Sequence, residues 1–193
     1  MKRFFTLFIL GICLTSPAIA EENTTSEQAK LLYADNSIEE SFNLLLSIPE
    51  EERTAENWLL LGNLLQDKGR DDDALFMYSQ AVLKDDKFYK AHYNLGNFYL
   101  NSDKPNMAID EYKKVLKLKN DYAYAYYNLG CAYLKLGQYR KAKNAFLDAV
   151  YFKNTEPDFY YNLAYVYKKM NKEKDAKAYL EIYNKIMETQ IDE

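Results

Sequence analysis

The sequence is poor in the residues from which catalytic and metal-binding sites are usually built. Its 193 residues include one His, two Cys and one Trp. Transition-metal sites draw most of their ligands from His and Cys, so these counts leave almost nothing with which to build one. The formal net charge is −4, without the positive excess that attracts nucleic acid. We therefore expect no metal, no other cofactor and no nucleic-acid partner.

The chain does contain enough apolar and charged residues for a folded protein. Hydrophobic residues make up 48% and charged residues 28%, which is typical of a packed globular chain. Tyr is the unusual component, with 19 residues. A chain of this length forms one domain or one continuous array. Together with the absences above, this composition favours a role in binding other proteins.

The first twenty residues have the pattern of a secretory signal peptide. Lys2 and Arg3 precede an apolar run over residues 4–14, and residues 18–20 (Ala-Ile-Ala) have the small-x-small pattern of a cleavage site. The apolar run is too short for a membrane-spanning helix, which needs about 20 such residues. We expect cleavage after Ala20 and an exported mature chain, periplasmic or extracellular, without a stable membrane span.

Two alternatives to this cleavage stay open. The stretch that ends at Cys13 resembles a bacterial lipoprotein signal, but Ile12 stands where a small residue is needed, which disfavours a lipid anchor. The second alternative is an uncleaved membrane anchor. After cleavage Cys131 is the one remaining cysteine, so the exported chain would have no intramolecular disulfide and would depend on its core for stability.

An internal period of 34 residues organises the rest of the sequence. Gly62, Gly96 and Gly130 share one phase of this period, and Gly69 and Gly137 share another. Further sets at the same interval are Trp58, His92, Tyr126 and Tyr160; Ala74, Ala108, Ala142 and Ala176; and Tyr78, Tyr112, Phe146 and Leu180. The period predicts an array of equivalent structural units.

Each unit is predicted to be two antiparallel helices joined by a tight turn. In residues 123–156 a helical stripe with i, i+3, i+4, i+7 spacing is interrupted at Gly137, and a second stripe follows. The residues of the two stripes are Tyr126, Leu129, Gly130 and Tyr133, then Ala142, Ala145, Phe146 and Ala149. Glycine inside a helix, as at Gly130, costs about 1 kcal/mol relative to alanine. We expect a close approach by the neighbouring helix to compensate.

Each unit has small residues at its eighth and twentieth places, an aromatic or Leu at the eleventh and, in most units, an aromatic at the twenty-fourth. This pattern resembles the tetratricopeptide repeat. The resemblance covers four full repeats, at 55–88, 89–122, 123–156 and 157–190, and leaves 191–193 as a tail. It implies an all-α, right-handed superhelical solenoid. The Pro usual near a repeat's end is replaced by Asp86, Asn120 and Asn154, which can cap the next helix.

Residues 21–54 form an acidic segment that contains a degenerate leading repeat over 26–54. Ala29, Leu32, Ser41, Leu45 and Ile48 fit the repeat if one residue is lost before residue 55. Terminal repeats need a polar outer face, so we interpret this segment as an N-terminal cap. An acidic docking surface is the alternative.

We expect no catalytic site. His92 occupies a place that Trp58 and Tyr126 hold in other repeats, so it is predicted to pack between helices without a nucleophile beside it. Residues 71–73 (Asp-Asp-Asp) lack the spacing of a calcium loop and are better explained by the favourable dipole at a helix start. Cys131 is predicted to be an inert packing residue or part of a groove wall.

The resemblance also implies a concave groove, lined by the first helix of each repeat, in which the family typically binds peptides or protein segments. An amide both donates and accepts, so a row of Asn residues can hold a peptide main chain. The alternative, that these Tyr and Asn residues only pack, stays open. Lys168 lies at the more basic end of the array and would favour an acidic part of the ligand. The predicted groove residues are Asn63, Tyr93, Asn94, Asn97, Tyr127, Asn128, Tyr161, Asn162, Tyr165 and Lys168.

The end of the last repeat suggests a second surface, because no further helix follows in the sequence to cover it. This face is predicted to pair with a second copy or with a partner, and its residues are Tyr179, Ile182, Tyr183, Ile186 and Met187. The leading interpretation is thus an exported, non-enzymatic scaffold that binds a protein segment in its groove. The alternative is an assembly subunit that acts through its C-terminal helix. The sequence leaves open the partner, the oligomeric state and the choice among periplasm, bacterial surface and eukaryotic secretory lumen.

Overall fold

The computed structural model describes residues 17–191, and it gives side-chain surroundings for residues 24–189. Most of the expected signal peptide and the last residues of the expected tail lie outside this range. The described chain is entirely helical and contains no strand, which confirms the predicted all-α class. It divides into two compact units, with the boundary between Glu52 and Arg53.

The first unit is a helical hairpin. Helix α1 (Pro17–Ala34) packs against α2 (Ile38–Leu46), and the short 3₁₀ helix η1 (Glu50–Glu52) follows. The Ser41 hydroxyl donates to the Ala29 carbonyl at 2.8 Å, and both residues are buried. Ala29 and Ser41 occupy the two positions of the degenerate repeat at which the full repeats have small residues.

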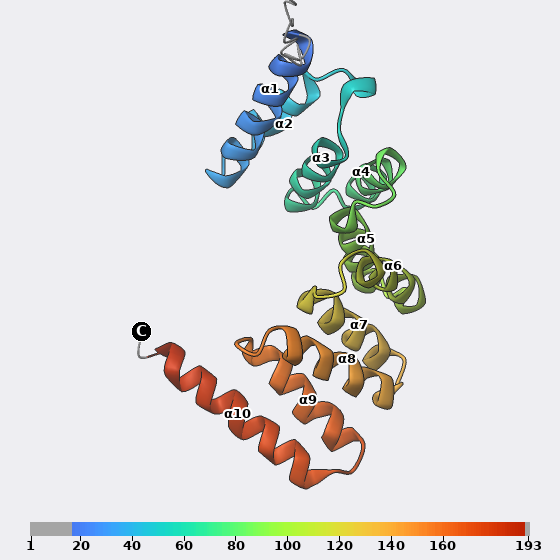
Figure 1. Ribbon diagram of the computed structural model, residues 1–193, viewed down its shortest axis with the longest axis vertical. Helices are drawn as coiled ribbons and strands as arrows, with labels where there is room; N and C mark the ends of the chain where they lie inside the picture. The colour runs from blue at the N-terminus through green and yellow to red at the C-terminus, as the bar shows by residue number, and fades with distance from the viewer. Residues whose placement is uncertain (1–16, 192–193) are drawn as a thin grey trace, which may run out of the picture. The chain divides into compact units, whose positions relative to one another are not determined.

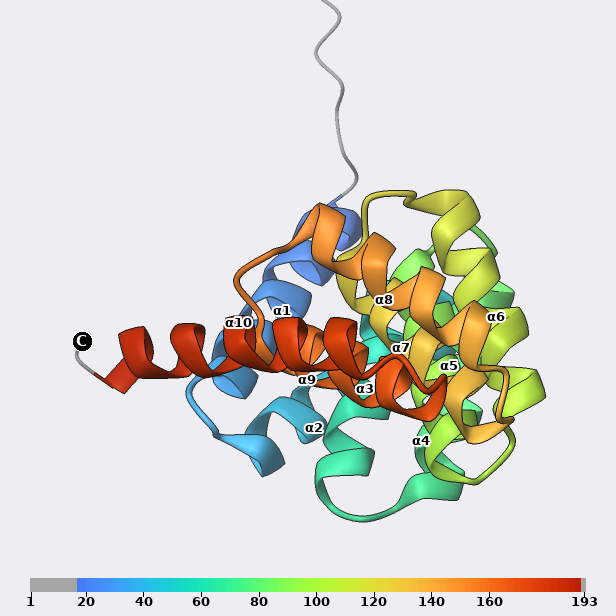
Figure 2. The same cartoon turned by 90° about the horizontal axis from the view of Figure 1, so that it is seen from below.

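The second unit is a row of helix pairs whose first helices begin 34 residues apart. Each first helix packs against the second helix of its own pair, and first helices also touch across repeats, α3 with α5 and α5 with α7. Figure 1 shows the row running from α3 to α10, and Figure 2 shows α10 extending past the end of α9. The helices are α3 (Ala55–Asp67), α4 (Asp71–Lys84), α5 (Tyr89–Asn101), α6 (Pro105–Leu118), α7 (Ala123–Lys135), α8 (Tyr139–Phe152), α9 (Pro157–Lys169) and α10 (Glu173–Ile191).

The turn inside each pair is set by one residue in the left-handed backbone region. Gly69, Asp103, Gly137 and Asn171 occupy the same place of their repeats and have φ of 71°, 56°, 68° and 57°. The next residue's N–H then bonds back to a carbonyl of the first helix, as from Gln138 to Tyr133 at 2.9 Å. This is the Schellman way of ending a helix, for which glycine is the best residue.

The glycines inside the first helices allow an aromatic ring of the paired helix to come close. A Cβ atom on Gly130 would lie 2.6 Å from ring carbons of Phe146, and one on Gly96 would lie 2.5 Å from Tyr112. The expected close approach is therefore confirmed. In the last repeat Ala164 replaces the glycine, and Leu180 replaces the ring.

Candidate functional site: a ladder of amides and a hollow at its end

The predicted groove residues all lie on first helices, on α3, α5, α7 and α9. Those of the earlier repeats are half-buried, whereas Tyr161, Tyr165 and Lys168 on α9 are exposed. The site therefore changes along the array, from a closely packed row to an open end.

Hydrogen bonds between repeats hold the predicted Asn residues in place. In each case the side-chain NH₂ of an Asn donates to a side chain of the preceding repeat. Asn94 donates to Asn63 Oδ1 at 2.8 Å, Asn128 to Asn97 Oδ1 at 2.8 Å and to the Tyr93 hydroxyl at 3.1 Å, and Asn162 to the Tyr127 hydroxyl at 2.8 Å. We call Asn94, Asn128 and Asn162 the amide row.

The two Asn acceptors of these bonds, Asn63 and Asn97, are themselves contacted by tyrosines of the second helices. The Tyr112 hydroxyl donates to Asn97 Oδ1 at 2.8 Å, and the Tyr78 hydroxyl lies 3.0 Å from Asn63 Oδ1. In the third repeat Phe146 lacks the hydroxyl and Cys131 stands in place of the Asn, so donor and acceptor are replaced together. Burial raises the pKa of the Cys131 thiol to about 11, so it stays neutral at physiological pH, as an inert groove wall requires.

The amide row keeps its acceptor side open. Among residues 24–189 no donor reaches Oδ1 of Asn94, Asn128 or Asn162, and these oxygens are not buried. The inter-repeat bonds use the NH₂ groups and thereby fix how each amide is oriented. The row can therefore accept hydrogen bonds from a ligand, while Asn128 and Asn162 each donate two bonds within the chain and Asn94 donates one.

A row of aromatic rings runs beside the amides from the second to the fourth repeat. Ring centroids lie 5.1 Å apart for Tyr93 and Tyr122, 6.1 Å for Tyr122 and Tyr124, and 6.0 Å for Tyr124 and Phe159. The ammonium groups of Lys119 and Lys153, 34 residues apart, lie over these rings. Sequence reasoning missed both lysines and gave Tyr122 no role, although the shared place of the two lysines was a visible signal.

The single His has a structural role that its place in the repeat predicted. His92 is buried, its Nδ1 lies 2.6 Å from Glu111 Oε2, and its Nε2 lies 3.0 Å from the Asp86 carbonyl oxygen. Tyr126 and Tyr160 donate to the corresponding carbonyls at 3.1 and 2.9 Å. The hydrogen bond with Glu111 raises the pKa of His92 against the opposing effect of burial. Because acceptors face both ring nitrogens, the geometry suits the doubly protonated ring.

A hollow of about 480 Å³ opens where the predicted groove reaches the last helix pair. Tyr161, Tyr165 and Lys168 of α9 and Lys177 and Leu180 of α10 line it. The exposed fractions of Tyr161, Tyr165 and Leu180 are 51%, 41% and 41%. We call this hollow the end socket.

The predicted interface on α10 is partly occupied by contacts within the chain. The ring of Tyr179 stacks on Tyr167 at 5.2 Å, and Tyr183 lies 5.5 Å from Tyr161 between centroids. Ile182 is exposed, whereas Ile186 and Met187 are half-buried.

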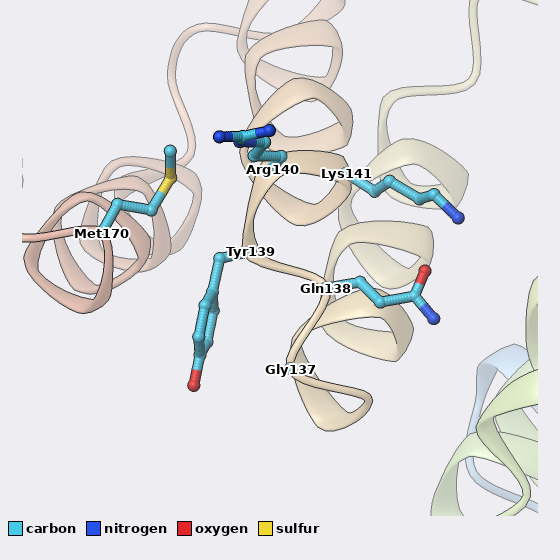
Figure 3. Close-up of a pocket in the computed structure, with 6 residues that line it drawn as sticks. All are labelled: Gly137, Gln138, Tyr139, Arg140, Lys141 and Met170. Atoms are coloured by element: carbon cyan, nitrogen blue, oxygen red, sulfur yellow. The ribbon is translucent and has the colours of Figure 1, made fainter.

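A second hollow, of about 460 Å³, lies at the turn between α7 and α8 beside Met170 (Figure 3). Figure 3 shows Gln138 and Lys141 extending away from Met170, while Tyr139 lies on the side of Met170. The side chains therefore do not converge on one point. Gln138 Oε1 is buried and has no hydrogen-bond partner within residues 24–189. No predicted site residue lies in this hollow.

The described part of the chain offers no grouping suited to a metal ion, since no three His, Cys, Asp or Glu side chains gather there. None of its helices is both long and apolar enough to span a membrane.

Comparison with known proteins agrees with the repeat pattern. The model of a TPR repeat family matches residues 106–137, and a tetratricopeptide repeat model matches 123–155 and 157–181. No curated protein matches the chain.

Solved structures with the same fold include two of the protein MamA. A crystal structure of MamA is 22% identical with a TM-score of 0.77, and the match covers 86% of this chain and 97% of that one. The structure of MamA residues 41 to the end from Desulfovibrio magneticus RS-1 is 20% identical with a TM-score of 0.78, covering 87% and 96%. At these identities the likeness establishes the fold. The family models thus show tetratricopeptide repeats over residues 106–155 and 157–181, and the helix pairs of the second unit carry the same 34-residue spacing back to Ala55.

Proposed function

We propose that this protein is an exported, non-enzymatic scaffold that holds an extended segment of another protein along the first helices of its repeats. Tetratricopeptide repeats support a role in protein–protein interaction in general. The observation that carries the finer proposal is the amide row, whose oxygens are oriented by inter-repeat bonds, are not fully buried and recur once in each of the last three repeats. Such acceptors fit the main-chain N–H groups of an extended segment and make little demand on its sequence.

The aromatic row supports the same proposal. Tyr side chains present large contact areas and lose little conformational entropy on binding. Lys119 adds positive charge beside the rings, which would favour an acidic residue in the bound segment, whereas Lys153 is already paired with Glu156.

The runner-up is an assembly subunit that acts through α10. Exposed Leu180 and Ile182 favour it, because apolar side chains on an uncovered helix face often mark an interface. Export rests on the signal-peptide pattern of residues 1–20.

The test is a pull-down from the envelope or secretory fraction of the native host, with the chain as bait. In the amide-row variant, Asn94, Asn128 and Asn162 are each replaced by Ala. The control carries Asn106→Ala and Asn144→Ala, the same substitution at exposed residues of the second helices α6 and α8, outside the predicted groove. Helical circular dichroism and the urea midpoint show whether each bait is folded.

We expect a partner that the wild-type and control baits retain and the amide-row bait loses. A partner retained equally by all three folded baits would contradict recognition by the amides. In that case the α10 assembly role would become the better interpretation.

A further inference from the structure

The end socket corresponds to the surface on which each earlier repeat receives the first helix of the next one. Tyr161, Tyr165, Lys168 and Leu180 line the socket. The residues 34 positions before them, Tyr127, Cys131, Leu134 and Phe146, pack around Leu163 and Val166 of α9. The socket is thus a repeat–repeat surface that no helix of the described chain covers.

The junction between the second and third repeats is built in the same way. Tyr93, Leu100 and Tyr112 pack around Leu129 and Ala132 of α7. In both junctions the incoming helix supplies two apolar side chains three residues apart, Leu first and Ala or Val second, and α5 carries Leu95 and Phe98 at the same places. This surface of the repeat therefore accepts a helix in which Leu is followed three positions later by a second apolar residue.

Each junction also uses the Tyr at the fifth place of the earlier repeat. The hydroxyl of Tyr127 accepts from Asn162, the residue directly before Leu163, and its ring stacks on Phe159 at 4.8 Å. Tyr161 holds the same place in the last repeat. Within residues 24–189 its hydroxyl has no hydrogen-bond partner, and half of its side chain is exposed.

Tyr183 closes only part of the socket. It occupies the place at which the earlier repeats carry Ala81, Val115 and Ala149, all fully covered by the array. Its ring lies 5.5 Å from that of Tyr161 between centroids, and the hollow of about 480 Å³ remains beside it. Leu180 and Tyr165 are left in contact with solvent.

Charge distinguishes the end socket from the junctions inside the array. Lys168 occupies the place that Leu134 and Leu100 hold in earlier repeats. Lys177 lines the socket from the other helix, α10. Glu173 is the one acidic residue of the lining. A helix that enters here meets two ammonium groups at the edge, which favours acidic residues on that helix.

We infer that the end socket binds an amphipathic helix of a partner protein. In this helix an Asn is followed directly by Leu, and a second apolar residue comes three positions after the Leu. Acidic residues flank this apolar face. The helix would continue the array as the first helix of a further repeat does. The inference deepens the proposed scaffold function and rests on it, since it adds a helix-binding surface to the groove for an extended segment.

The probe is a fluorescent, helix-stabilised peptide with the sequence of residues 157–169, in which the two terminal lysines are replaced by Glu. A bridge between the positions of Tyr161 and Tyr165 holds it helical, because that face of α9 points away from the preceding repeat. Binding to the full chain is followed by fluorescence anisotropy. Leu180→Asp is the socket variant, and Leu83→Asp, at an exposed Leu of α4, is the matched control.

We expect saturable binding that Leu180→Asp weakens about tenfold or more and Leu83→Asp leaves unchanged. A peptide with Ala for Asn162 and Asp for Leu163 should bind as weakly. No saturable binding to the wild-type chain, or equal binding to both variants, would overturn the inference. A wild-type dimer in sedimentation that Leu180→Asp dissociates would also overturn the inference, because a second copy of the chain would then cover the socket.

The amide-row variant separates this inference from the groove. It should bind the peptide with unchanged affinity even where it loses a cellular partner. Loss of the partner without any peptide binding would refute the socket and leave the groove standing. Peptide binding with a partner unaffected by the amide-row variant would refute the groove alone.

Discussion

Replacing Gly130 by Ala should destabilise the array, and replacing Phe146 by Leu in the same chain should restore much of the loss. A Cβ atom at residue 130 would lie 2.6 Å from Cδ1 and Cε1 of Phe146. The ring is fully buried and so cannot swing into solvent. The last repeat shows the accommodating pair, since Ala164 and Leu180 hold the same two places.

The expected magnitudes follow from two opposing effects. Alanine gains about 1 kcal/mol over glycine inside a helix. Overpacking a dense core costs about 1–3 kcal/mol, so Gly130→Ala alone should lower the free energy of unfolding by up to about 2 kcal/mol. Phe146→Leu alone removes buried atoms and should cost about 1–2 kcal/mol. In the double variant the added methyl occupies space that the ring has left, so the two losses should not add.

The assay is urea unfolding of the wild type, both single variants and the double variant, followed by circular dichroism at 222 nm. We expect the double variant to be more stable than the sum of the single losses predicts, by about 1 kcal/mol or more. Losses that add within about 0.5 kcal/mol would refute the account of the glycine as a site of close helix approach.

Three further predictions concern pH, the turns and export. Hydrogen bonding raises the pKa of His92 above its ordinary value. The stability that protonated His92 gives the fold is therefore fully present below about pH 6.5, the pKa in the unfolded chain, and is lost as the pH rises through the pKa in the folded chain. The single imidazole NMR signal should titrate at that raised value, and in His92→Tyr this part of the pH dependence of the urea midpoint should vanish; an unchanged profile would contradict the assignment. Asn171→Gly, at φ 57°, should raise the free energy of unfolding by about 0.5–1 kcal/mol in urea melts, and a loss of stability would refute the conformational argument. Mass spectrometry of the protein from its native host should find a chain that begins at Glu21, whereas an intact N-terminus would contradict cleavage.

The sequence predicted those features that depend on the place of a residue in its repeat. Glycines at fixed intervals indicated both the turn at Gly137 and the close approach at Gly130, because backbone conformation and the lack of a Cβ are properties of the residue type. The same reasoning placed His92 between helices, since Trp and Tyr hold its place elsewhere.

The pairing of side chains across repeats was beyond the sequence. The sequence predicted Asn128 as a groove residue but did not predict the bonds of its NH₂ group to Asn97 and Tyr93, which depend on how far one repeat is rotated on the next. The position of Lys119 over the ring of Tyr122 depends on the same rotation. Tyr127 illustrates the consequence, because its ring stacks on Phe159 and its removal would disturb the array as well as any ligand.

The central claim is that the first-helix face of the array binds another protein. Site-specific photo-crosslinking in the native host tests it most directly, with p-benzoylphenylalanine placed at Tyr165, or at Tyr151 on the exposed side of α8. We predict that ultraviolet light links the probe at residue 165 to another protein and that the probe at residue 151 gives no such product. Crosslinks at residue 151 alone, or at neither residue, would contradict the claim.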